Sequence, residues 1–103
     1  MFITINHIND YAGVEMFRPG MNLILKKDMS NPYDDEAITV YSERECKYGY
    51  VANSVSTVCR GTHSAGYIYQ FFDEETKCII RFVAEDFAIA ELDFDNNSES
   101  TTR

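Results

Sequence analysis

Two adjacent side chains in this sequence have the chemistry of a binding site: the phenol of Tyr33 and the carboxyl group of Asp34. A phenol ring can stack on a flat partner, and a carboxylate can accept a hydrogen bond from a hydroxyl group. Pro32 fixes its own φ near about −65° and biases Asn31 away from the helical region, while the Asn31 side chain can bond nearby backbone in an Asx turn. We therefore expect a stiff turn that presents Tyr33 and Asp34 to solvent. An ordinary turn without a binding role is the alternative, and it stays open.

The sequence carries few signals of catalysis. It has no Gly-rich phosphate loop and no Gly-x-Ser-x-Gly elbow. His7 falls in the alternating pattern of the first expected strand, where a core or edge imidazole is the simpler interpretation, and His63 has no visible nucleophile beside it. The acidic run 34–36 has no neighbouring histidine. We expect no catalytic residue, no cofactor and no metal ion. A metal-dependent hydrolase or nuclease is the least favoured alternative.

The cysteines and the N-terminus indicate a cytoplasmic protein. Cys46, Cys59 and Cys78 are odd in number, which excludes a fully paired disulfide framework, and they show no Cys-x-x-Cys spacing. Free thiols are typical of a reducing compartment. Residues 1–6 lack the basic patch and apolar run of a secretory signal, and no apolar stretch approaches the roughly 20 residues that span a bilayer. We expect no membrane segment.

Length and charge predict one acidic domain followed by a tail. A chain of 103 residues has room for a single domain, and its net charge is −8. Residues 1–84 hold 11 acidic and 8 basic side chains, whereas residues 85–103 hold six acidic side chains and one arginine. We predict a domain over 1–93 and an acidic, polar tail over 94–103. The negative charge argues against broad binding to phosphate backbones, but a few residues can still hold one strand end.

The apolar residues recur with a period of two, which predicts a mainly-β barrel or sandwich of about six or seven short strands. Asn53 and Ser54 can cap a short helix that Gly61 ends. A plausible hairpin joins the fifth and sixth strands. The helix is expected over 55–60, and the strands over 1–8, 21–27, 37–41, 48–51, 67–72, 77–83 and 87–92.

Aromatic side chains with a few cations on a small β-domain are the usual means of holding single-stranded nucleic acid, because each base stacked on a ring is worth roughly 1–3 kcal/mol. For most of the rings core packing is the alternative, whereas Tyr33 is hard to bury between Pro32 and three acidic residues. The candidate rings are Tyr11, Phe17, Tyr33, Tyr48 and Tyr50, and the candidate phosphate ligands are Arg18, Lys26, Lys27, Lys47, Arg60 and Arg81.

The sequence resembles the HIRAN domain over about residues 2 to 92, in the run Gly20…Leu23-Ile24-Leu25-Lys26-Lys27-Asp28…Asn31-Pro32-Tyr33-Asp34…Ala37-Ile38-Thr39-Val40…Gly49-Tyr50-Val51. This module occurs at the N-terminus of some helicase-like remodelling proteins and ubiquitin ligases, and as small stand-alone bacterial proteins. The segments Ala52-Asn53-Ser54 and Gly61-Thr62…Ser64-Ala65-Gly66 look like the bacterial form.

The resemblance implies an OB-like β-barrel with one or two short helices that captures the 3′-hydroxyl end of single-stranded DNA. It implies that Tyr33 stacks on the terminal base and that Asp34 accepts a hydrogen bond from the 3′-hydroxyl, with Asn31 in the same turn. DNA-capturing members carry an Arg-Tyr pair after the first strand. Here only Tyr11 is an approximate match, and Arg18 is the candidate substitute for the arginine.

Two functions follow from these observations. The leading one is a non-catalytic module that binds a single-stranded DNA 3′ end. The alternative is a protein-interaction or adaptor domain that keeps the fold and holds a partner chain with the same loop, or with an apolar ribbon over 67–72.

Overall fold

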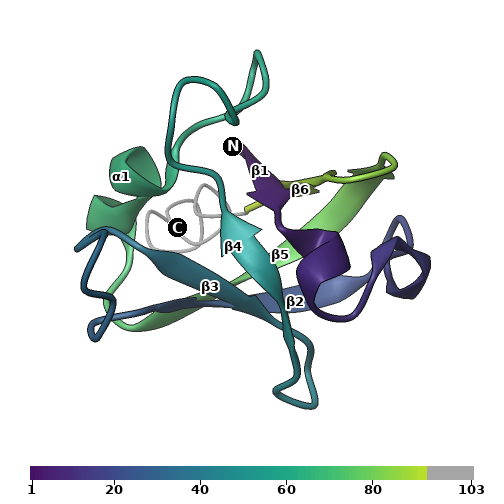
Figure 1. Ribbon diagram of the computed structural model, residues 1–103, viewed down its shortest axis with the longest axis horizontal. Helices are drawn as coiled ribbons and strands as arrows, with labels where there is room; N and C mark the ends of the chain where they lie inside the picture. The colour runs from purple at the N-terminus through teal and green to yellow at the C-terminus, as the bar shows by residue number, and fades with distance from the viewer. Residues whose placement is uncertain (93–103) are drawn as a thin grey trace, which may run out of the picture.

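The computed structural model describes residues 1–92, in which six antiparallel strands close into a barrel in the order β1-β4-β3-β2-β5-β6 (Figure 1). The predicted tail 94–103, with residue 93, lies outside the described residues. None of the helices in residues 1–92 has the length and apolarity needed to cross a membrane. The strands are β1 (Phe2–Asn6), β2 (Asn22–Lys27), β3 (Ile38–Tyr41), β4 (Lys47–Val51), β5 (Glu75–Val83) and β6 (Ala88–Glu91), and the helices are α1 (Ala65–Ile68) and the 3-10 turns η1 (Ile8–Asp10), η2 (Val14–Met16) and η3 (Tyr69–Phe71).

The barrel interior is filled by the inward residues of the alternating strands. In β2, for example, Leu23 and Leu25 are fully buried while their neighbours reach the surface. This alternation is what allows a sheet to close on a core, since one face of each strand is apolar. The mainly-β barrel prediction is confirmed, with six strands. The largest fully buried side chains include Ile3, Ile5, Ile8, Leu23, Leu25, Ile38, Val40, Ile68 and Ile80.

The predicted strand over 67–72 is wrong, because this segment forms α1 and η3. The Ser64 side chain caps the helix by accepting the Tyr67 amide at 3.2 Å. Ala65 and Ile68, three residues apart, are then both fully buried against the barrel. There is therefore no hairpin with β5, which pairs with β2 and β6 instead. The apolar ribbon invoked for a partner chain does not exist as a strand.

The predicted helix over 55–60 is also wrong, because the segment forms turns. The Ser54 carbonyl accepts the amides of Thr57 and Val58, both at 3.0 Å, but the ladder stops there. The next amide, Cys59 N–H, donates to Thr4 Oγ1 at 3.1 Å. Hydroxyl and β-branched residues favour such local alternatives over a helix. Thr4 is consequently buried, although the alternation of β1 places it on the outer face.

Strand β1 ends at Asn6 rather than at Ile8, because His7 adopts a left-handed conformation with φ of 61°. Strand β4 passes very close to this end of β1. A Cβ built on Gly49 would lie 2.5 Å from the Asn6 carbonyl oxygen, so a glycine is needed there. This close approach sets Tyr50 beside the loop that follows β1.

Candidate nucleic-acid interface

The turn that starts at Asn31 has the geometry expected from its sequence. Asn31 Oδ1 accepts the amide of Tyr33 at 2.8 Å and the amide of Asp34 at 3.1 Å, which confirms the Asx turn. The Tyr33 side chain points into solvent and is 95% exposed. Its ring is therefore available for stacking.

The carboxylate of Asp34 is oriented by two hydrogen bonds. Oδ1 accepts the Glu36 amide at 2.9 Å, and Oδ2 accepts Asn53 Nδ2 at 3.1 Å. Asn53 Oδ1 in turn accepts the Gly66 amide at 2.8 Å, so one side chain links the β2–β3 loop to α1, which lie side by side (Figure 1). Each carboxylate oxygen has two lone pairs. Asp34 is therefore fixed in orientation and keeps acceptor capacity on both oxygens.

An open depression of about 400 Å³, here called the Asn31 depression, lies between this turn and the end of β1. None of its lining residues carries a carboxylate, although the chain has a net charge of −8. Asn6, one of them, holds a buried Oδ1 that has no hydrogen-bond partner within residues 1–92. An unpaired buried acceptor is costly, and a ligand donor would satisfy it once a rotation of the Asn6 side chain exposed this oxygen. The lining residues are Asn6, His7, Asn31, Tyr50, Val51, Asn53, Ser54 and Thr57.

Two rings that line the Asn31 depression, those of His7 and Tyr50, belong to an aromatic cluster that also includes Tyr11 and a cation. The Tyr50 ring lies edge-on to the rings of Tyr11 and His7, at 6.1 and 6.2 Å between centroids. Lys47 Nζ donates to the Tyr50 hydroxyl at 2.8 Å and lies 5.1 Å from the Tyr11 ring centre. The hydrogen bond with Tyr50 raises the pKa of Lys47, and the Tyr50 hydroxyl likewise raises the pKa of Tyr11. Lys47 therefore stays charged, and the Tyr11 phenol stays neutral, at neutral pH.

The structure brings some predicted site residues together and leaves others apart. Neither Tyr11 nor Arg18 lines the Asn31 depression. Tyr11 contacts the lining residue Tyr50, whereas Arg18 donates to the Glu15 carbonyl at 3.3 Å. Among the described residues, Lys47 is the basic side chain that contacts the Tyr11 ring. Phe17 and Tyr48 are core residues, each 5% exposed, and cannot stack on a ligand.

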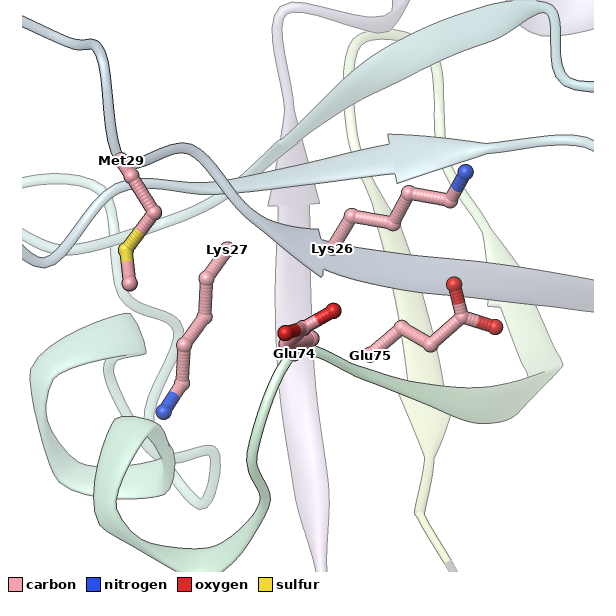
Figure 2. Close-up of a pocket in the computed structure, with 5 residues that line it drawn as sticks. All are labelled: Lys26, Lys27, Met29, Glu74 and Glu75. Carbon is pink, nitrogen blue, oxygen red and sulfur yellow. The ribbon is translucent and has the colours of Figure 1, made fainter.

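Lys26 and Lys27 are engaged at a different depression (Figure 2). Their side chains leave β2 in opposite directions, and Glu74 and Glu75 line the same depression. Lys27 Nζ donates to the Phe72 carbonyl at 2.7 Å and lies 4.1 Å from the Tyr69 ring centre. Its ammonium group thus holds η3 against the barrel. Two carboxylates beside these lysines make this a poor phosphate site.

Sequence reasoning missed the roles of Asn53 and Asn6. From the sequence, Asn53 is expected as a helix cap, and Asn6 only as one residue of the first strand. The available signal for Asn53 was its place directly after Gly49-Tyr50-Val51-Ala52, in a segment already noted for its family resemblance. Its bond to Asp34 joins residues 19 positions apart, which no local pattern reveals.

The fold is similar to the crystal structure of the HIRAN domain of human HLTF, with a TM-score of 0.63 and 16% identity over 87% of this chain and 69% of that chain. It is also similar to a crystal structure of a protein from Lactobacillus plantarum, with a TM-score of 0.57 and 20% identity over 86% of this chain and 87% of that one. No curated protein matches the sequence. The family model for the HIRAN domain matches residues 4–71, which is more than half of the sequence. This chain therefore belongs to the HIRAN domain family.

Proposed function

We propose that this domain captures the 3′-hydroxyl end of single-stranded DNA and catalyses no reaction. The observation that carries the proposal is the Asn31 depression. It is free of carboxylates in its lining, holds the unpartnered Oδ1 of Asn6, and is bordered by the turn that presents Tyr33 and Asp34. Such a site suits a neutral, donor-bearing group at the end of an anionic chain.

Asp34 supplies the discrimination between chain ends. A terminal hydroxyl can donate to a carboxylate oxygen, whereas a terminal phosphate would bring like charges together. Asn31 and Asn53, which both line the Asn31 depression, hold Asp34 by hydrogen bonds. The carboxylate is thus pre-oriented before a strand arrives, which lowers the cost of binding.

Tyr33 supplies stacking that tolerates any base. Its exposed ring can cover the face of the terminal base, and Lys47 offers one cation near Tyr11 for the last phosphate. A stacked base contributes roughly 1–3 kcal/mol, so a few contacts suffice without a wide basic surface. The dependence of affinity on salt should therefore be shallow, in keeping with few phosphate contacts.

Fluorescence polarisation at low salt with two matched oligonucleotides, one ending in a 3′-hydroxyl and one in a 3′-phosphate, tests the proposal. We expect tighter binding of the hydroxyl-ended strand. Tyr33→Ala should weaken binding of that strand roughly 5- to 150-fold, from the loss of one stacked base. Asp34→Asn should weaken the hydroxyl-ended strand and not the phosphate-ended one.

Asp35→Asn is the matched control, because it removes the same charge from an exposed neighbour of Asp34. It should leave the preference for the hydroxyl end unchanged. Equal affinity of the wild-type protein for both ends, or no binding of either at low salt, would overturn the proposal.

A further inference from the structure

A second depression, here called the Tyr67 depression, adjoins the Asn31 depression. The two share Asn53 and Ser54, so they form neighbouring parts of one surface. The remaining walls come from the 55–62 turns and from the start of α1. The lining residues are Asn53, Ser54, Val55, Val58, Thr62, His63, Ser64 and Tyr67.

The Tyr67 depression contains a pre-formed stack of rings. The His63 and Tyr67 rings are nearly parallel, with 18° between their planes and 4.4 Å between their centroids. Both are anchored through the backbone: the His63 amide donates to the Phe2 carbonyl at 2.8 Å, and the Tyr67 amide donates to the Ser64 side chain at 3.2 Å. Tyr67 nevertheless remains 44% exposed. Large rings held at the surface in fixed positions stack on a ligand with little loss of side-chain entropy.

These two depressions differ from three others on the described surface in the charged side chains that line them. Each of those three pairs its glutamates with an equal number of cations: Glu74 and Glu75 with Lys26 and Lys27, Glu43 with Arg44, and Glu91 with Lys77. The Asn31 and Tyr67 depressions have no acidic lining residue. On a protein of net charge −8, a lining without charged carboxylates reduces the repulsion of an anionic chain, and the nearest carboxylates with a described contact, Asp34 and Asp10, bond to the lining residues Asn53 and His7.

We infer that the Tyr67 depression is a stacking site for a nucleobase of the same DNA strand, upstream of the nucleotide held at the Asn31 depression. The inference rests on the proposed function and extends it from one end-binding site to a path along the strand. The base extends the stack formed by His63 and Tyr67, while the shared residues Asn53 and Ser54 lie under the connecting backbone. Stacking without base-edge contacts makes this site indifferent to sequence.

The test compares hydroxyl-ended oligothymidylates that carry a single abasic site at each of the first four positions from the 3′ end, measured by fluorescence polarisation. For the wild-type protein, one upstream abasic position should weaken binding roughly 5- to 150-fold, as expected for one lost stack. Tyr67→Leu should weaken the intact strand by a similar factor and should add nothing on the strand that lacks that base. Tyr67→Phe, which keeps the ring, should bind like the wild type.

Phe82→Leu is the matched control, because Phe82 is an exposed ring on β5 that lines neither depression. Wild-type affinity that is unchanged by every upstream abasic site would overturn the inference without the use of any variant. A Tyr67→Leu penalty of equal size on all abasic strands would overturn it as well. In both cases a retained preference for the 3′-hydroxyl leaves the proposed function standing, whereas failure of the wild-type protein to bind any strand removes both.

Discussion

Replacement of Asn53 by alanine should loosen the turn that carries Asp34. The Asn53 side chain makes one hydrogen bond on each side: it donates to Asp34 Oδ2 at 3.1 Å and accepts from the Gly66 amide at 2.8 Å. Asn53→Ala removes both and leaves the β2–β3 loop without this link to α1. The fold itself should survive, because Asn53 lies outside the core.

The magnitude follows from the two bonds. A neutral hydrogen bond is worth about 0.5–1.5 kcal/mol, and one to a charged group about 1.5–3 kcal/mol. Asn53 is only half-buried, so water replaces part of each bond. We therefore expect a loss of about 1.5–3 kcal/mol in the free energy of unfolding. At about 4–8 °C per kcal/mol for a domain of this size, Tm should fall by roughly 6–24 °C.

Asn53→Asp sharpens the assay, because it sets a second carboxylate against Asp34. Two such groups in contact cannot both ionise cheaply, which raises one pKa of the pair in the folded state. A raised folded-state pKa favours the folded protein at low pH, and this contribution is lost as pH rises through it. Calorimetry should therefore show Asn53→Asp to be less stable than Asn53→Ala at pH 7, with the difference shrinking as pH falls towards about 4.

The same variants report on binding. With Asp34 free to rotate, Asn53→Ala should reduce the preference for a 3′-hydroxyl over a 3′-phosphate end. Asn22→Ala is the control, since the exposed Asn22 side chain has no hydrogen bond to other residues in the range 1–92. An Asn53→Ala protein with wild-type Tm and an unchanged preference would refute the argument that this residue positions Asp34.

Three further predictions concern the barrel. Gly49→Ala should destabilise the fold by about 1–3 kcal/mol in denaturant titrations, because its Cβ would lie 2.5 Å from the Asn6 carbonyl oxygen. Burial raises the pKa of the Cys78 thiol to about 12. The protonated thiol therefore contributes stability that is fully present below its ordinary pKa near 9.0 and is lost as pH rises towards 12. In the folded protein at pH 8, a thiol reagent should modify the exposed Cys46 and leave Cys78 unmodified. Lys27→Met should lower Tm by removing the bond to the Phe72 carbonyl, yet leave oligonucleotide affinity within about twofold of wild type, and a large loss of affinity would contradict the structural role assigned to Lys27.

Local patterns determined the strands and the turn that bears Tyr33. Alternation in segments such as β2 specifies a half-buried strand because successive side chains point to opposite faces. The Asx turn likewise depends on residues within three positions, so Asn31 and Pro32 sufficed to predict that Tyr33 would be exposed. Short-range interactions depend on residues that are neighbours in the sequence, so they can be predicted from it.

Tertiary structure decided the conformation of the two mispredicted segments and the make-up of the candidate site. In each case the deciding contacts are with residues far away in the sequence. Residues 67–72 alternate well enough for a strand, but burial of Ala65 and Ile68 against the closed barrel favours α1. The 55–60 segment loses its helix to the bond between Cys59 and Thr4. The candidate site was hidden for the same reason: the link from Asn53 to Asp34 and the depression lined by Asn6 exist only once β1, β4 and the β2–β3 loop have met.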